Sequence, residues 1–444
     1  MIHASIPSVR LPSPLNRGLL IACALLLGGC VVQETRPLPK LNAVQSQQQI
    51  PDDQLLDLAI REFDPGIPAD TTDEDALAKR RIYPDVRRAE SRILPAKLRA
   101  TLEATGHWGP VRVVPASVQF VDVLVTGRIL ASTGTELALE ISAVDSMGRK
   151  WLERKRYESA ADTGSYKTDA ALRARDPFQN VYAAIANDLL AARERLTAAD
   201  RRDIRRVTNL RFARDLAPVA FEGYLAADAE GVLRPTRLPA ADDPGVARIE
   251  RIRERDAAVI DTVDGYYGNF TEKLSDSYGG WRRTSYDAIE KEDKLRRQAR
   301  TRTVLGAAAV LASVFVPGQC ASGDYNCQRI ENAARSAGAV GGIAAVMSGI
   351  KKYGDAKTAA QDVRELARSF EGEVAPQVVD LEGRTLKLTG TAEEQYREWR
   401  RLLAQIYAEE TGGSAAPAAT TAPAATAPSA TPAATPAAST TPGS

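Results

Sequence analysis

Histidine is the scarcest chemistry-bearing residue in this chain, because the 444 residues include only His3 and His107. His3 lies in the first 29 residues, which read as a leader, so a single histidine is left for the body of the protein. A zinc site built on several histidines is therefore excluded, and a Ser-His-Asp triad would have to use His107. His107 lies in a glycine-containing segment that predicts a turn between a helix and a strand. We predict no catalytic residues, no metal and no cofactor.

An excess of charge of either sign is also missing. Lys and Arg number 58, Asp and Glu number 57, and the net charge is +1. A dedicated nucleic-acid binder usually carries a strongly basic face, so we expect no nucleic-acid partner. The basic run at residues 201–206 contains Asp203, which favours a solvated helix face over a phosphate-binding patch. The hydrophobic share of 44% is that of a globular protein.

Long apolar runs are absent too. The apolar stretch at residues 18–27 is shorter than the roughly 20 residues that a membrane-spanning helix needs. Arg10 and Arg17 precede it, a pattern that is typical of an export signal peptide. The stretch ends in Leu27-Gly28-Gly29-Cys30, which is an aliphatic residue, two small residues and a cysteine.

This four-residue segment resembles the lipobox of bacterial lipoproteins. The resemblance implies that a diacylglycerol is attached to the Cys30 thiol, that the leader is cut between Gly29 and Cys30, and that the new amino group receives a fatty acid such as palmitate. Several acyl chains, at about 0.8 kcal/mol per buried methylene, would anchor the protein durably. Val31, rather than Asp, follows the cysteine. By analogy with lipoproteins of Gram-negative bacteria, this implies the outer membrane, on its periplasmic side.

The part of the chain from residue 81 to 215 has the pattern of an α+β domain. Leucines spaced by four predict a helix, and alternating apolar residues predict strands with one buried face. Together they predict a small, mainly antiparallel sheet with helices against it. The expected elements are a helix at 86–104 that Pro95 kinks or restarts, strands at 111–114, 121–130, 137–143 and 150–157, and a closing helix at 178–196.

A second resemblance rests on three groups of residues in this domain. The groups are Leu102-Glu103-Ala104-Thr105-Gly106-His107-Trp108, Val123-Leu124-Val125-Thr126-Gly127, and Val144-Asp145 with Gly148 and Trp151. Through them, residues 98–151 resemble the amino-terminal domain of TolB and related periplasmic domains of curli-secretion and penicillin-binding-protein-activator lipoproteins. That resemblance implies a helix, two strands and a hairpin that dock protein partners, without catalytic residues. The family's first strand, before the helix, is not evident in this sequence.

A long helical hairpin is expected from residue 246 to 370. Its first arm carries a heptad-like stripe, as in a coiled coil, that passes through four glycines at which a helix can break. The stripe is Ile260, Val263, Tyr267, Phe270, Leu274, Ser277, Trp281, Thr284 and Ala288, and the glycines are Gly265, Gly268, Gly279 and Gly280. A packed helical seam is the favoured interpretation of its aromatic residues, and stacking on glycan is the alternative.

The tip of this hairpin holds the only other pair of cysteines, Cys320 and Cys327. Cys23 would leave with the leader and Cys30 would be acylated, so in an oxidising periplasm we expect a Cys320–Cys327 disulfide. A redox pair is the rival interpretation, but such pairs usually have two residues between the cysteines. The flanking apolar segments, 304–316 and 337–350, are each too short to span a membrane.

The ends of the mature chain are simpler. Residues 31–52 read as a polar tether, and Thr72 is expected to cap a short helix, with a metal site as the sharper alternative for Asp73, Glu74 and Asp75. Near the C-terminus we expect a strand at 385–389 and a helix that Thr391 and Glu394 begin as a capping box. The expected division is 1–29 signal peptide, 30–80 tether and short helix, 81–215 α+β domain, 216–245 linker or peripheral lobe, 246–370 helical hairpin, 371–411 strand-helix end, and 412–444 disordered tail rich in Ala, Pro and Thr.

These features favour a non-enzymatic scaffold or assembly factor that is anchored by lipid and docks envelope proteins. One alternative is a membrane-active or oligomeric part of a secretion device, acting through the helical hairpin, whose second arm carries a stripe of small residues at Ala337, Gly341, Ala345 and Gly349. Self-association of the chain stays open. A cell-wall-modifying enzyme or glycan binder is the second alternative, and it would require a cleft with converging carboxylates.

Overall fold

The computed structural model describes residues 39–166, 175–240, 242–315, 377–381, 384–388 and 390–411. The expected lipidation and cleavage site at Gly29 and Cys30, the expected disulfide between Cys320 and Cys327, the second apolar segment at 337–350 and the tail all lie outside these residues.

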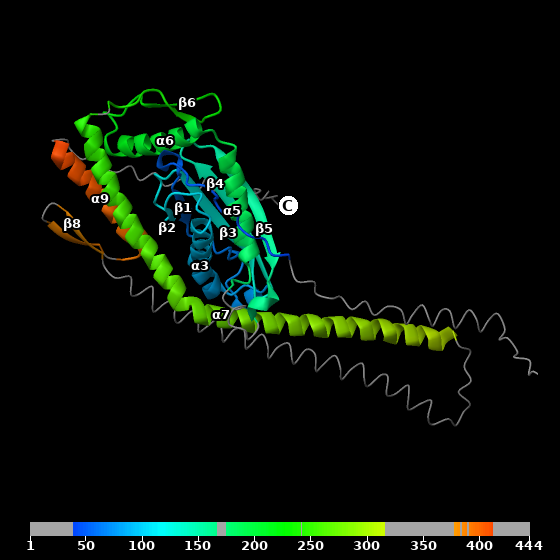
Figure 1. The fold of residues 1–444 in the computed structure, drawn as a ribbon. Helices are drawn as coiled ribbons and strands as arrows, with labels where there is room; N and C mark the ends of the chain where they lie inside the picture. The colour runs from blue at the N-terminus through cyan, green and yellow to red at the C-terminus, as the bar shows by residue number, and fades with distance from the viewer. Residues whose placement is uncertain are drawn as a thin grey trace, which may run out of the picture.

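The centre of the molecule is one five-stranded sheet with helices against it, so the fold is α+β as the sequence predicts (Figure 1). Strand order is β2-β1-β3-β4-β5. The long strands β3, β4 and β5 pair antiparallel, while the short β1 runs parallel to both of its neighbours. The bounds are β1 Leu58–Arg61, β2 Val111–Val114, β3 Val123–Ser132, β4 Glu136–Asp145 and β5 Lys150–Ala160.

Strand β1 corrects two expectations. The sequence shows no evident first strand and predicts an α+β domain that begins at residue 81, yet β1 lies inside the sheet between β2 and β3. Leu58 and Ile60 are buried in the core on one face, and Ala59 is buried on the other. A strand that is buried on both faces shows no polar alternation. At four residues it is also too short to stand out in the sequence.

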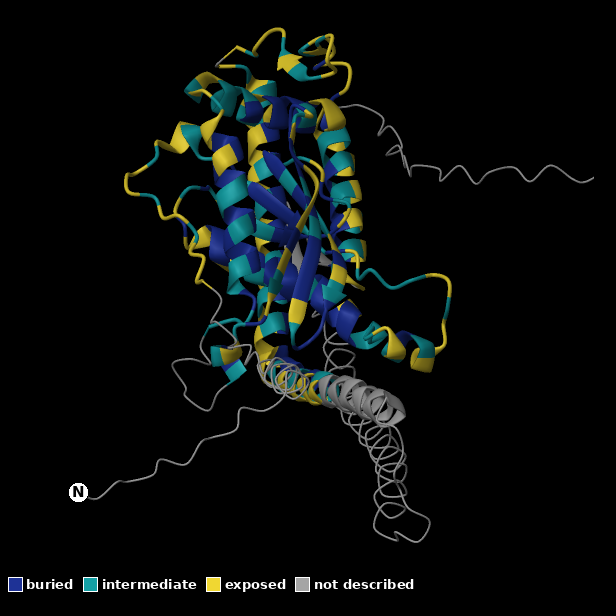
Figure 2. Ribbon diagram, turned by 90° about the vertical axis from the view of Figure 1, so that its right-hand side faces the viewer, coloured by how far each residue is buried: buried dark blue, intermediate teal, exposed yellow. Residues whose placement is uncertain are grey.

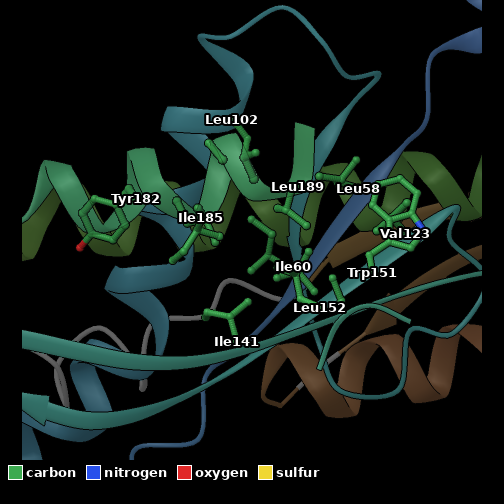
Figure 3. Packing of buried hydrophobic residues seen from close by; sticks show 14 of the residues in the cluster. Leu58, Ile60, Leu102, Val123, Ile141, Trp151, Leu152, Tyr182, Ile185 and Leu189 are labelled. Carbon is green, nitrogen blue, oxygen red and sulfur yellow. The ribbon is translucent and has the colours of Figure 1, made fainter. Parts of the chain in front are cut away.

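One face of the sheet carries the main core. Helices α3 (Pro84–Glu103) and α5 (Gln179–Glu194) cover it, and their apolar residues interdigitate with those of the strands (Figure 3). Leu102, Leu189 and Ile60 belong to this core, and each of their side chains is 0% exposed. Full burial of one such side chain contributes about 1.5–3 kcal/mol. Pro95 lies inside α3, and the helix runs through it without restarting.

The expected tether is shorter than predicted, because residues 39–46 lie along α5 as an N-terminal strap. Asn180 Nδ2 donates to the Pro39 carbonyl at 3.1 Å, and its Oδ1 accepts from Leu41 N at 3.0 Å. Asn187, seven residues later, repeats this arrangement with Asn42 O at 3.1 Å and Val44 N at 2.9 Å. Two helical turns separate the two amides, so they point to the same side of α5.

A short helical turn precedes β1 in the chain, and a short helix lies between β1 and α3. The 3-10 turn η1 spans Asp52–Gln54, and helix α2 spans Glu74–Lys79. The cap of α2 is Asp73 rather than Thr72, since Asp73 Oδ1 accepts a bond from Asp75 N at 2.9 Å. The acidic triplet therefore serves capping, as favoured, with the residue shifted by one.

The segment expected to be a linker or lobe forms a small hairpin beside a long helix. Helix α6 (Ala198–Leu216) begins with a capping box of Thr197 and Asp200. Strands β6 (Leu225–Ala227) and β7 (Leu233–Pro235) then pair antiparallel at the edge of the molecule, where Figure 2 shows mostly exposed residues. A 3-10 turn, η2 (Thr163–Tyr166), follows β5.

Helix α7 (Pro244–Phe315) runs through all four glycines without interruption, although Figure 1 shows that it bends beside the body of the molecule. Its stripe packs against the body, and the rings of Tyr267, Phe270, Tyr278 and Trp281 are buried. The packed seam is therefore confirmed, and these rings present no platform for a glycan. At 1.5 Å per residue the helix is roughly 110 Å long. Figure 1 shows its C-terminal part extending beyond the sheet and its helices.

The described part of the chain closes with a second hairpin and a helix. Strands β8 (Gln377–Leu381) and β9 (Arg384–Leu388) pair, of which only β9 is expected from the sequence. Helix α9 (Ala392–Thr411) starts with the predicted capping box, in which Thr391 N donates to Glu394 Oε2 at 2.8 Å and Glu394 N to Thr391 Oγ1 at 3.3 Å. None of the helices in the described ranges carries an apolar stretch that could cross a bilayer.

Candidate binding groove

An open groove of about 390 Å³ lies on the sheet face opposite α3 and α5. Val123 and Val125 point into the main core, so Leu124, between them in β3, points to the groove. Val144 of β4 lies beside it, since the two residues are register partners. The remaining walls come from the end of β1, the loop before β3, the β4–β5 turn, α6 and the β6–β7 hairpin.

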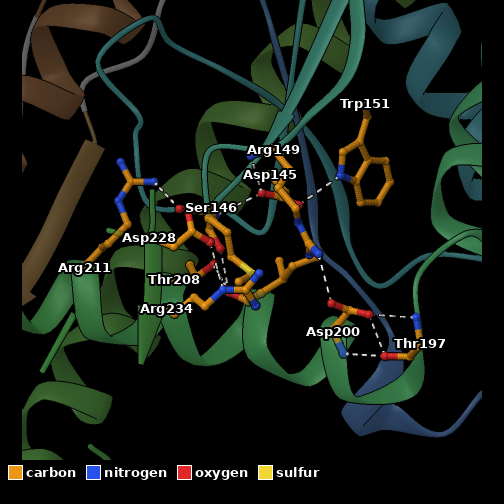
Figure 4. Close-up of polar contacts among 12 residues, drawn as sticks. Asp145, Ser146, Arg149, Trp151, Thr197, Asp200, Thr208, Arg211, Asp228 and Arg234 are labelled. Carbon is orange, nitrogen blue, oxygen red and sulfur yellow. Dashed lines mark hydrogen bonds and ion pairs between the residues drawn. The ribbon is translucent and has the colours of Figure 1, made fainter. Parts of the chain in front are cut away.

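The β4–β5 turn forms one wall and is organised by Asp145 (Figure 4). Asp145 Oδ1 accepts from the backbone N–H groups of Met147 and Arg149, each at 3.0 Å. Its Oδ2 accepts from Arg149 Nε at 2.8 Å and from Trp151 Nε1 at 3.1 Å. Gly148 supplies the positive φ of +91° that the turn requires. The Asp145 charge is thus fully engaged, and the arrangement is structural.

Those contacts also unite three residues that carry the second resemblance. Asp145, Gly148 and Trp151 belong to the motif of that resemblance, and the structure places them together at the β4–β5 hairpin, Asp145 at the end of β4, Gly148 in the turn and Trp151 in β5. Arg149 extends the network to Asp200 at the start of α6, with Nη1 at 3.0 Å from the carboxylate. The turn is therefore attached to the helix that forms the neighbouring wall.

The β6–β7 hairpin closes the groove on another side. Leu233 N donates to the Met147 carbonyl at 2.9 Å, so the hairpin is fastened to the β4–β5 turn. Within the hairpin, Asp228 accepts from Val232 N at 2.8 Å and pairs with Arg234 Nε at 3.0 Å (Figure 4). These bonds to the charged form lower the pKa of Asp228, the Val232 backbone bond most of all.

Two arginines of the groove have no carboxylate partner among the described residues. Arg61 Nη2 donates to the Val118 carbonyl at 3.0 Å, and its Nε lacks a hydrogen-bond partner. Arg211 Nη1 donates to the Ser146 carbonyl at 3.0 Å. Burial lowers the pKa of both guanidinium groups, and Arg214 lowers that of Arg211 further, while Glu393 acts in the opposite direction on Arg61. An arginine nevertheless stays charged at neutral pH.

The hydroxyl group of the groove is engaged by the protein itself. Ser146 Oγ donates to the Ile204 carbonyl at 2.6 Å and is buried, so it is no exposed nucleophile. Across the described ranges, no group of three His, Cys, Asp or Glu residues is arranged to hold a metal. Partly buried positive charge beside the apolar Leu124 and Val144 suits an anion that carries aliphatic groups.

A second polar cluster, around Glu90, is buried and closed to solvent. Glu90 is 0% exposed, and its Oε1 accepts from Ser132 Oγ at 2.5 Å, Tyr278 Oη at 2.8 Å and Arg282 Nη2 at 3.1 Å. Arg87 Nε lies 3.9 Å from Oε2. The cluster joins α3, α7 and the end of β3.

The turn after β3 is drawn against α7 at this same place. Arg282 Nη1 donates to the Thr133 carbonyl at 2.7 Å, and Gly134 N donates to Ser285 Oγ at 3.0 Å. A Cβ on Gly134 would lie 2.2 Å from Tyr286 N, so this close approach requires glycine. The converging groups around Glu90 therefore serve packing, and they do not open on a cleft.

His107 has the structural position expected of it. It lies between α3 and β2, and Gly106 before it has a φ of +70°. Burial lowers the pKa of His107, nearby Arg193 lowers it further, and a backbone bond to Val44 of the strap opposes both. The basic run 201–206 is likewise engaged, for example Arg202 with Asp53 at 3.4 Å and Arg206 with Asp203 at 2.9 Å.

Sequence reasoning missed the groove and its two arginines. Arg61 ends a strand that reads as part of the tether, and Arg211 is one of many basic residues in α6. No local pattern links them. Comparison of the chain with protein-family models, with curated proteins and with solved structures found no match.

Proposed function

We propose that this chain is the precursor of a bacterial lipoprotein that is anchored through Cys30 to the outer membrane, faces the periplasm and acts as a non-enzymatic docking or assembly factor. The anchor rests on the lipobox-like segment that ends at Cys30. The docking role rests on the groove, whose charge and apolar lining suit a ligand and whose described residues supply no catalytic pair.

The strap supports an arrangement close to the membrane. Only eight residues separate Cys30 from Pro39, where the chain is already bonded to α5. At about 3.3–3.6 Å per residue, this connection reaches at most roughly 30 Å. A lipid on Cys30 would therefore hold the α+β body near the bilayer surface instead of on a long, free tether.

Fatty-acid labelling tests the anchor. Cells that express the chain are fed radiolabelled palmitate, and the Cys30→Ala protein is expected to carry no label and to remain uncleaved. Cys23→Ala is the matched control, since it changes a cysteine of the leader but leaves the lipobox-like segment intact. Label that enters the Cys30→Ala protein would contradict the proposed anchor.

A membrane-active role is the second candidate, and α7 is the observation that favours it. The backbone of this helix extends beyond the body (Figure 1), and its last residues from Val304 on are apolar in sequence. A mature chain without signal peptide and with Cys30→Ser separates the two roles in a liposome flotation experiment. The docking role predicts that this protein stays at the bottom of the gradient, whereas firm flotation would favour membrane activity.

A further inference from the structure

We infer that the groove lined by Arg61 and Arg211 binds an extended, acidic peptide segment of a partner protein, in which an Asp or Glu carboxylate is attracted by the two guanidinium groups. The inference rests on the proposed docking function and specifies the chemistry of the partner. It starts from the charge of the groove. Both arginines donate only to backbone carbonyls, and neither has a carboxylate at ion-pair distance in the described parts of the chain.

The acidic residue that does line the groove leaves this charge uncompensated. Asp145 has each of its oxygens occupied by two donors, including Arg149, so it does not neutralise the other arginines. Glu393 raises the pKa of Arg61, but it forms no ion pair with that arginine; it pairs with Arg397 at 3.3 Å and accepts from Ser117 N at 3.2 Å. The groove therefore presents two positive charges that an anionic ligand could pair with.

The backbone of the groove points to a carboxylate rather than a phosphate. Phosphate sites usually collect free backbone N–H groups at a helix N-terminus or in a nest. Here the N–H groups of the β4–β5 turn are used internally: Ser146 N donates to Asp122 O, Gly148 N to Asp145 O, and Met147 N to the Asp145 side chain. Guanidinium groups pair bidentately with carboxylates as well as with phosphates, so it is the internal use of these N–H groups that favours a carboxylate.

The apolar lining and the size point to a peptide. Val121, Leu124, Val144 and Leu233 line the groove around the arginines and suit aliphatic side chains that flank the acidic residue. A volume of about 390 Å³ falls within the roughly 300–1,000 Å³ of ligand sites. That space is suited to a few residues of an extended chain and not to a folded domain.

Binding is measured on the full-length lipoprotein in detergent micelles, labelled with ¹³C at the methionine methyl groups. The chain has three methionines, and Met147 belongs to the β4–β5 turn that lines the groove, with its side chain fully buried in the adjoining core. A ligand in the groove is therefore expected to shift its methyl resonance through the turn. The probes are two blocked tripeptides, acetyl-Val-Glu-Val-amide and acetyl-Val-Gln-Val-amide. We expect the acidic peptide to shift the Met147 signal with saturation, and the amide peptide to bind at least about tenfold more weakly.

Variants assign the effect to the arginines. Arg61→Gln and Arg211→Gln are each expected to weaken binding of the acidic peptide about tenfold. Arg214→Gln is the matched control, because Arg214 lies on the same helix as Arg211, is exposed and does not line the groove. Arg61→Lys and Arg211→Lys keep the charge and serve as second variants if a glutamine variant fails to fold.

Three results would overturn the inference: no Met147 shift with the acidic peptide, equal binding of both peptides, or equal weakening by Arg214→Gln. A response to inorganic phosphate or to phosphatidylglycerol vesicles without a response to the acidic peptide would overturn it as well. Palmitate labelling at Cys30 does not involve the groove. Failure of the peptide experiment therefore leaves the anchor standing, and failure of the anchor leaves the peptide result standing.

Discussion

Arginine serves two different ends in two regions of this molecule. Arg282 is 4% exposed and is enclosed with the carboxylate of Glu90, with Tyr278 and with the Thr133 carbonyl. Arg61 and Arg211 lie in an open groove and meet only backbone carbonyls. A buried charge whose partner is present joins helices, and removing that partner is costly. An arginine in an open groove that has no carboxylate partner within its own chain can pair with a carboxylate of another molecule.

Removing the carboxylate from the closed cluster has the largest expected effect. Glu90→Ala leaves Arg282 and Arg87 without their acid in a buried setting, so we expect a loss of about 3–5 kcal/mol in the free energy of unfolding. Chemical denaturation followed by tryptophan fluorescence measures it. Glu140→Ala is the control, because Glu140 pairs with the 74% exposed Arg154, and solvent screens such a surface pair so that its loss has little effect on stability. An equal loss of unfolding free energy in the two variants would show that the buried arginine cluster is no more dependent on its carboxylate than an exposed ion pair is.

The second-largest effect is expected when the strap is released from α5. This variant tests whether exposed hydrogen bonds also stabilise the position of residues 39–46. The double variant Asn180→Ala, Asn187→Ala removes four bonds to residues 39–44, which should cost locally about 1–2 kcal/mol. Hydrogen exchange at the amides of Leu41 and Val44 is then expected to accelerate about tenfold, with little change in global stability. Asn209→Ala, at an exposed position of α6, is the control. Unchanged exchange at both amides would show that the side-chain amides do not hold the strap.

A smaller effect is expected at the junction of α7 and α9, where Asp256 accepts from Trp399 Nε1 at 3.1 Å and from Tyr396 Oη at 3.3 Å. Burial raises the pKa of Asp256, and it outweighs Arg400, which lowers it. When the pKa of a carboxyl group is higher in the folded than in the unfolded state, protonation of that group stabilises the folded state. The contribution is complete below the unfolded-state pKa and is lost as the pH rises through the folded-state pKa. On acidification from pH 7 toward pH 4, wild type should therefore gain stability relative to Asp256→Asn, by about 1.4 kcal/mol per unit of raised pKa. Denaturation at several pH values measures this, and a gain in the opposite direction would show that the Arg400 charge dominates.

The smallest expected effect is the change in stability when the two positive charges of the groove are removed. Arg61→Gln with Arg211→Gln removes one carbonyl bond from each arginine but also two partly buried charges, so the opposing contributions should leave a change under about 1 kcal/mol. Arg282→Gln, in the closed cluster, is the comparison and should cost several times more. Thermal unfolding of the two proteins side by side gives the answer. A loss in the groove variant as large as that of Arg282→Gln would make Arg61 and Arg211 structural residues.

The elements that sequence periodicity predicts are those with one buried face. The alternation at residues 137–143 marks β4, and the steps of three and four from Ile260 to Trp281 mark the buried stripe of α7. The capping box at Thr391 is equally local, because both partners lie within one turn. Strand β1 escaped prediction since it is short and buried on both sides. The four glycines of α7 do not interrupt the helix, because its packing against α3 and β2 outweighs their cost of about 1 kcal/mol each.

By itself the sequence determined the α+β class, most element positions and the absence of a multi-histidine metal centre, because each of these depends on composition or on contacts within a few residues. Only the tertiary structure decided that β1 lies inside the sheet, that residues 39–46 lie on α5, and which arginine is enclosed and which is open. The groove combines residues near positions 61, 121, 146, 211 and 233, which approach one another only when the sheet, α6 and the β6–β7 hairpin are assembled. Charge compensation depends on distance in space, and spacing along the chain carries no record of it.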